Sequence, residues 1–192
     1  MIDYSPARKE IKAAKRCLES MRTSTTYEDF EEYWRETLGH IEKSFTKLLS
    51  ATNAVKSKFT STFSKEFMYK KNDQLLVYLT QARNADTHTV ADISQKIPAR
   101  TAITSPPGIR DHYIHYMAIK NYLLVDYVGD PIIVTFHPED IETIAVKNQG
   151  NIYPPPLTHL GEKITTRRPF YLAEKGIIFY EAWIDKSSNI FK

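Results

Sequence analysis

FEEYWRETLGHIEKSFTKLL occupies residues 30–49 of this 192-residue chain. Its large apolar side chains recur every three or four positions, and mostly polar residues fill the positions between them. This is the period of one face of an α-helix, so the stretch predicts an amphipathic helix of about five turns with one buried side. A capping box before it, with Thr25 three positions ahead of Glu28, predicts where the helix begins. The apolar stripe consists of Phe30, Trp34, Leu38, Ile41, Phe45, Leu48 and Leu49.

Similar helical patterns lie on both sides of this stretch. A first helix is expected to start at Ser5-Pro6, because proline in the first turn of a helix loses no hydrogen bond. A weaker pattern covers residues 51–71, and Asp73 is placed to cap a further helix that runs into residues 83–88. We therefore expect residues 1–95 to form a helical bundle. The apolar positions of these helices are Ile11, Ala14, Leu18 and Met21; Val55, Phe59, Phe63 and Phe67; and Leu75, Leu76, Leu79 and Ala82.

The pattern changes from helical to β after about residue 96. We interpret Gly129-Asp130 as a hairpin turn between two strands, and we expect residues 96–160 to form a small antiparallel sheet. The prolines of Tyr153-Pro154-Pro155-Pro156 require an extended segment, which we interpret as a strap that joins the sheet to the last helix. The predicted strands lie at residues 112–119, 122–128, 131–136 and 141–146.

A C-terminal helix is expected to open at Pro169, with Ala173, Ile177, Tyr180 and Ile184 on one apolar face. A helix of this kind needs an apolar partner, and the N-terminal bundle offers the largest one. The predicted fold class is therefore α+β. It combines a helical bundle at residues 1–95, a β region at residues 96–160, and a returning helix within residues 161–192.

Composition sets limits on function. Hydrophobic residues make up 42% of the chain and charged residues 26%, which is typical of a globular protein. The formal net charge of +3 neither demands nor excludes a polyanionic partner. Cys17 is the sole cysteine, so an internal disulfide and a cysteine-based structural zinc site are excluded. We see no signal-peptide profile and no run of about 18 apolar residues, so a cytoplasmic protein without a membrane span is expected.

The segment QARNADTH at residues 81–88 carries the clearest chemistry. His88 offers an imidazole that can exchange a proton near neutral pH, and Arg83 offers a permanent planar cation suited to phosphate. On a helix, Asn84 and His88 are four positions apart and share a face. Arg83 and His88 are five positions apart, about 140° around the helix axis. They would border one cleft if the helix frays at His88, or if a second copy packs across a two-fold axis.

This segment resembles the hallmark of the HEPN domain superfamily, which is an Arg, a polar residue that is often Asn, three further positions and then a His. Arg83-Asn84-Ala85-Asp86-Thr87-His88 matches that pattern at each defined position. The resemblance covers roughly residues 1–95, with the C-terminal helix as a further candidate part, and it implies an all-helical HEPN-like bundle.

In catalytically active HEPN proteins the Arg and His are required for metal-independent RNA cleavage at a dimer cleft. The resemblance therefore implies a homodimeric endoribonuclease. His88 would serve as general base or acid, Arg83 would stabilise the phosphoryl oxygens, and Asn84 would orient the imidazole or the phosphate. It implies RNA as substrate and no metal or cofactor. By analogy, a toxin or defence setting would add an antitoxin or regulatory protein as a partner.

Other interpretations stay open for the same residues. Arg83 and Asp86, three positions apart, could form only a surface ion pair, and His88 could be only a C-terminal helix cap. HEPN-like domains also include non-catalytic members that bind RNA, nucleotides or proteins. A binding module with the sheet as its recognition face is therefore the rival hypothesis.

The remaining candidate residues carry weaker signals. His112 and His115 are three apart on a predicted strand and face opposite sides, so shared metal ligation is not expected. Arg167-Arg168 could contact phosphate ahead of the last helix or could simply be solvated. His159 could pack against the bundle or extend a site.

Overall fold

The structure is a computed structural model that describes residues 2–89 and 92–191, and for residues 87–89 it describes the backbone only. The chain divides into two compact units. Unit 1 comprises Met1–Gln95 and Glu142–Lys192, and unit 2 comprises Lys96–Ile141. Helices and small antiparallel ladders together make the fold α+β, as the sequence predicts. Residues 142–160, which the sequence pattern assigns to the β region, belong to unit 1 with the helices.

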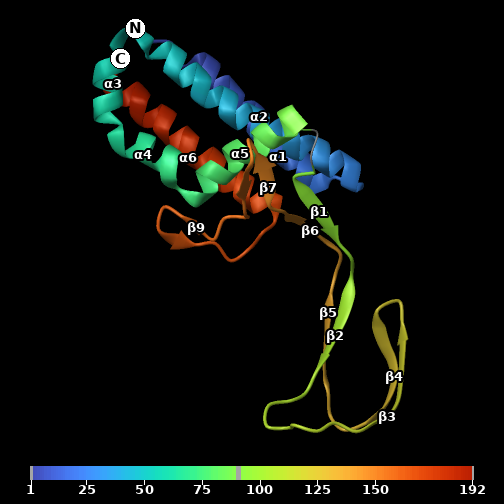
Figure 1. The fold of residues 1–192 in the computed structure, drawn as a ribbon. Helices are drawn as coiled ribbons and strands as arrows, with labels where there is room; N and C mark the ends of the chain where they lie inside the picture. Colours follow the sequence, from blue (N-terminus) through green and yellow to red (C-terminus); the bar gives the residue numbers. More distant parts are fainter. Residues whose placement is uncertain (1, 90–91, 192) are drawn as a thin grey trace. The chain divides into compact units, whose positions relative to one another are not determined.

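Unit 1 is mainly helical. Helices α1 and α2 lie side by side, and α6 packs against both of them and against α5 (Figure 1). The four-residue spacing of phenylalanines after α2 does not give one helix, because the helical run is interrupted at Phe63. Over the described residues the helices are α1 (Ser5–Thr23), α2 (Tyr27–Ala51), the short 3-10 helix η1 (Asn53–Val55), α3 (Lys56–Thr62), α4 (Ser64–Asn72), α5 (Gln74–Thr89) and α6 (Pro169–Ile190).

Local side chains explain where these helices begin. α1 begins at Ser5, next to the proline that predicts its start. The N-cap of α2 is Thr26, whose hydroxyl accepts the Asp29 N–H at 3.1 Å. The predicted capping pair, Thr25 with Glu28, is therefore wrong by one residue. The observed pair, Thr26 with Asp29, has the same three-residue spacing. Asp73 caps α5 as predicted, because its Oδ1 accepts the Leu76 N–H at 3.1 Å.

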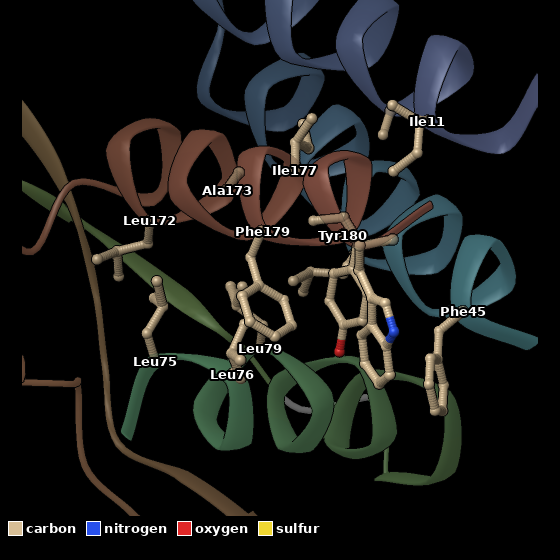
Figure 2. Close-up of a cluster of buried hydrophobic side chains, with 14 of the residues drawn as sticks. Ile11, Phe45, Leu75, Leu76, Leu79, Leu172, Ala173, Ile177, Phe179 and Tyr180 are labelled. Atoms are coloured by element: carbon tan, nitrogen blue, oxygen red, sulfur yellow. The ribbon is translucent and has the colours of Figure 1, made fainter. Parts of the chain in front are cut away.

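α6 is the central helix of unit 1. Figure 2 shows it between α5 on one side and the α1–α2 pair on the other, with Leu172 near Leu75 and Ile177 on the side of Ile11. Trp183 is buried and broadens the apolar face, as the sequence predicts, and Leu172 and Phe179 extend it further. Gly176 lies at the closest approach to α5, where an added Cβ would collide with a methyl group of Leu79. α6 and α5 therefore pack closely enough to fix each other's position.

Two short hairpins complete unit 1. β7 (Val146–Asn148) pairs with β8 (Asn151–Tyr153), and β9 (Thr158–His159) pairs with β10 (Glu162–Lys163). Both turns have two residues with positive φ, Gln149-Gly150 and Leu160-Gly161, as tight hairpins require. The Pro154–Pro156 strap runs between these hairpins and lies against the start of α5.

Unit 2 consists of separate two-stranded ladders. β2 (Arg100–Thr104) pairs with β5 (Ile133–His137), and β3 (Ile114–Lys120) pairs with β4 (Leu123–Gly129). The chain enters unit 2 along β1 (Ser94–Ile97) and leaves along β6 (Asp140–Thr143), and these two strands pair with each other.

The predicted single sheet is therefore wrong, and so is the predicted hairpin at Gly129-Asp130. Within the described residues the ladders form five separate two-stranded sheets. The tight turn of unit 2 is Asn121-Tyr122, where both φ angles are positive. Asp130 instead closes the far end of the β3–β4 ladder, where its carboxylate accepts the Tyr113 N–H at 2.9 Å.

Candidate functional site at the end of α5

Helix α5 carries the Arg83–His88 motif and is held in unit 1 by one apolar stripe. Leu75, Leu76 and Leu79 are buried in its first half. Ala82 and Ala85 continue the stripe at 0% exposure into the motif itself. The flanking positions of this turn are only partly buried.

Arg83 and Asn84 occupy those flanking positions. Both residues are half-buried, and the Arg83 Nη1 donates a hydrogen bond to the Asn84 Oδ1 at 3.2 Å. The guanidinium and the amide are therefore held side by side, next to buried alanines. A planar cation beside an amide presents several N–H donors in one place, which is the chemistry that binds a phosphate group.

His88 lies on the last turn of α5, which ends at Thr89. Its backbone is helical, so Asn84 and His88 stand one turn apart on the same side of the helix axis. Arg83 is five positions before His88, which corresponds to about 140° around the axis. The side chain of His88 lies outside the described residues, so the motif is located here by its backbone.

Asp86, the acidic residue inside the motif, pairs with an arginine from α2. Its carboxylate contacts Nη1 of Arg35, and Nη2 of Arg35 lies 3.3 Å from a carboxylate oxygen of Glu31. All three side chains are less than 30% exposed, so the cluster is partly shielded from solvent. The ion pair of Asp86 with Arg35 ties the motif to α2.

The cluster continues from Glu31 to the chain that follows α5. The Tyr27 hydroxyl lies 3.4 Å from Glu31 and donates to the Ser94 carbonyl oxygen at 2.9 Å. Ser94 is only 2% exposed. Burial, followed by the nearby Glu31 carboxylate, raises the pKa of Tyr27, so this phenol remains a hydrogen-bond donor at neutral pH. Sequence reasoning missed these residues, although Glu31 and Arg35 show the i, i+4 spacing of a helical ion pair.

His159 lies away from the motif, at the other end of α5. It is 9% exposed, and its Nδ1 lies 2.9 Å from the Asp73 Oδ1, while the Asp73 Oδ2 accepts the Leu160 N–H at 2.7 Å. Burial opposes ionisation of Asp73, but the hydrogen bonds from His159 and the backbone outweigh it and hold the pKa of this carboxyl below its ordinary value. His159 therefore anchors the β9–β10 hairpin to the helical unit. Asp73 and Arg83 are ten positions apart, about 15 Å along the helix.

Arg167 borders a different surface pocket. This cavity has a volume of about 460 Å³, and its lining includes Tyr78, Tyr153 and the Pro154–Pro156 strap. The strap is fixed to α5 by a hydrogen bond from the Leu157 N–H to the Gln74 Oε1 at 2.9 Å. The pocket adjoins the start of α5 and is not part of the motif.

The other predicted chemistry can be placed as well. Among the described residues, no group of three or more His, Cys, Asp or Glu side chains is arranged to hold a metal ion. The His115 ring packs edge-on against Tyr113. Burial, with a hydrogen bond to Glu36, raises the pKa of Cys17 to about 11, so its thiol is a poor nucleophile at neutral pH.

None of the helices, over the residues that the structure describes, combines the length and the apolar character that crossing a membrane requires.

The site therefore has two parts: Arg83 with Asn84 near the surface of α5, and the Asp86–Arg35–Glu31 cluster that fixes the same turn of helix to α2. No protein-family model matches the chain, and comparisons with curated proteins and with solved structures gave no significant match.

Proposed function

We propose that this protein is a metal-independent, HEPN-like endoribonuclease whose reacting groups are Arg83, Asn84 and His88. The observation that carries the proposal is the Arg83–Asn84 pair, hydrogen-bonded at 3.2 Å and half-buried on a helix whose backbone continues through His88. The full Arg-Asn-x-x-x-His spacing thus lies on one helix of a helical unit, which is the setting that the resemblance implies.

The proposed reaction uses the ribose 2′-hydroxyl as the nucleophile. His88 removes its proton, the 2′-oxygen attacks the adjacent phosphorus, and the bond to the 5′-oxygen breaks as that oxygen takes a proton from water. Arg83 stabilises the negative charge that builds on the phosphoryl oxygens, with the Asn84 amide beside it. The products are a 2′,3′-cyclic phosphate and a 5′-hydroxyl end. DNA lacks the nucleophile and is expected to resist cleavage.

A homodimer is part of this proposal. Arg83 and His88 are five positions apart, about 140° around the axis of an ideal helix, so we propose that a second copy of α5 completes the cleft. Two α5 helices related by a two-fold axis would bring Arg83 of one chain near His88 of the other. The catalytic cleft would then contain two sets of the same groups.

The test is cleavage of a single-stranded RNA by the purified chain in the presence of EDTA. Arg83→Ala and His88→Ala should each remove activity by at least a hundredfold, because they delete the charge stabiliser and the proton carrier. Arg110→Ala and His137→Ala replace an exposed Arg and an exposed His of unit 2, and they should cleave like the unaltered chain. Loss of cleavage on adding EDTA, or equal activity in the motif variants and the controls, would refute the proposed mechanism.

A non-catalytic binding module is the second candidate, and the exposed apolar surface of unit 2 favours it. In that case the purified chain would leave RNA intact in every buffer. It would still retain RNA or a protein partner, and retention would depend on unit 2 rather than on Arg83.

A further inference from the structure

We propose that unit 2 is a self-association arm that packs against unit 2 of a second copy of this chain. The first observation is that every residue of Lys96–Ile141 keeps at least intermediate exposure to solvent. The buried hydrophobic side chains of the described chain all belong to unit 1. A two-stranded ladder without a covered face is only marginally stable in water, so unit 2 needs a partner surface to hold its shape.

The amount of uncovered apolar surface is large. Thirteen large hydrophobic residues between Ile109 and Phe136 are 38–66% exposed. With about 150–200 Å² for each large side chain, they present on the order of 1,000 Å² of apolar surface. A stable protein–protein interface needs about 800 Å² from each partner. This apolar total is spread over the faces of two ladders and is of the order that one partner contributes to a stable interface, so the contact has to involve more than one of these faces.

The apolar residues lie on both faces of the β3–β4 ladder. Tyr116 and Met117 are neighbours on β3, so their side chains point to opposite faces, and they are 53% and 40% exposed. Tyr116 stands directly opposite Val128, which is 53% exposed, so one face carries an uncovered cross-strand pair. A ribbon with two apolar faces cannot shield itself by folding onto one surface. A second ribbon of the same kind can cover such a face.

Charge and strand edges favour a second copy over a nucleic acid. Unit 2 has four Lys or Arg residues against five Asp or Glu residues, so it offers no net attraction to a phosphate backbone and little repulsion to its own copy. Each ladder has only two strands, so all four strands of the two ladders have an unpaired edge. An antiparallel edge can pair with the same edge of an identical chain across a two-fold axis.

This inference rests on unit 2 and does not depend on the proposed nuclease function. The proposed contact uses residues of unit 2, whereas the proposed α5–α5 contact of the nuclease uses residues of unit 1. RNA cleavage by Arg83→Ala and sedimentation of variants in unit 2 are therefore separate measurements. Loss of cleavage with unchanged assembly concerns the nuclease alone, whereas a chain that stays monomeric would count against both proposed contacts.

The test is sedimentation velocity on the full chain from about 1 to 100 µM, a range that covers typical association strengths. The unaltered chain should sediment with twice the 22.2 kDa mass of one chain. The double variant Tyr116→Lys with Val128→Glu replaces the exposed cross-strand pair by opposite charges. Opposite charges can still face each other across β3 and β4, but the apolar contact that this pair offers to a second chain is lost. It should raise the dissociation constant at least a hundredfold.

The matched control is Ile178→Lys with Ile190→Glu, two residues of α6 that are 59% and 55% exposed. This control should dimerise like the unaltered chain. Hydrogen exchange supplies the second readout: amides of β2–β5 and β3–β4 should lose protection in the arm variant, while those of α2 and α6 should keep it. A monomeric unaltered chain at 100 µM, a dimeric arm variant, or a control that dissociates instead would each overturn the proposal. The proposal would also be overturned if the chain stayed monomeric and bound a different protein.

Discussion

Asp73 fixes the start of the motif helix, so removing its charge is expected to destabilise unit 1. The side chain is 5% exposed, and its carboxylate accepts hydrogen bonds from the Leu76 and Leu160 N–H groups at 3.1 and 2.7 Å. Nδ1 of His159 lies 2.9 Å from the same carboxylate. One small group therefore caps α5 and holds the β9–β10 hairpin against it.

Two substitutions separate these roles. Asp73→Asn keeps an oxygen for the helix cap but loses the charge that strengthens the other hydrogen bonds. A hydrogen bond to a charged group contributes about 1.5–3 kcal/mol, so we expect a loss of about 2 kcal/mol in the free energy of unfolding. Asp73→Ala also loses the cap, which costs about 1 kcal/mol more. For a chain of this length the Asn variant should melt about 4–8 °C lower than the unaltered chain.

The assay is urea unfolding followed by far-ultraviolet circular dichroism, repeated over a range of pH. The folded-state pKa of Asp73 lies below its ordinary value of 3.8. The unfolded chain therefore binds this proton first as the pH falls, and the stability that Asp73 contributes is present above pH 3.8 and lost below it. The gap between the unaltered chain and Asp73→Asn should shrink in acid. The reasoning would be refuted if the unaltered chain and Asp73→Asn differed by less than about 0.5 kcal/mol in the free energy of unfolding above pH 3.8, or if that difference grew in acid. A charge-assisted hydrogen bond should contribute more than this.

Three further predictions concern packing, the motif helix and the single thiol. Gly176→Ala should destabilise unit 1 by about 1–2 kcal/mol in urea unfolding, because its new methyl collides with a buried leucine of α5. Gly39→Ala has nothing within 4 Å of the new Cβ and should instead stabilise α2 by up to about 1 kcal/mol, so a shared sign for the two variants would contradict the packing argument. Under the proposed nuclease function, Asp86→Asn should lower RNA cleavage at least tenfold at unchanged substrate affinity, because the ion pair with Arg35 then no longer fixes the motif turn; an unchanged rate would remove that positioning role. Cys17 should react slowly with a thiol reagent at pH 7, with a rate that rises about tenfold per pH unit toward its pKa of about 11, and fast reaction at neutral pH would contradict the burial of its sulfur.

The helices could be predicted from the sequence because their signals are local. The stripe from Phe30 to Leu48 and the helix opened by Pro169 are fixed by residues three and four positions apart. Strand pairing is not local, so it could not be predicted in the same way. β2 pairs with β5, from which it is separated by the whole β3–β4 hairpin, and no short-range pattern encodes that choice. The turn at Asn121-Tyr122 was missed because Tyr122 takes a positive φ without glycine.

The same distinction between local and non-local signals applies to the candidate site. The positions of Arg83, Asn84 and His88 on one helix follow from the local pattern that ends α5. The partner of Asp86 does not, because Arg35 is 51 positions away on α2. A sequence contains many carboxylates that could pair with a given arginine, and only the packing of α2 against α5 selects one.

Both ends of α5 are therefore tied to other elements, by Asp73 with His159 at its start and by Asp86 with Arg35 near its end. A helix held at both ends keeps Arg83 and Asn84 in one orientation before any ligand arrives, and preorganised groups lose less entropy when they bind. Arg83 and Asn84 are half-buried beside the alanine stripe and are not part of the buried core. Loss of cleavage in Arg83→Ala at unchanged stability would then report on chemistry, whereas loss of cleavage in Asp73→Ala would report on the scaffold.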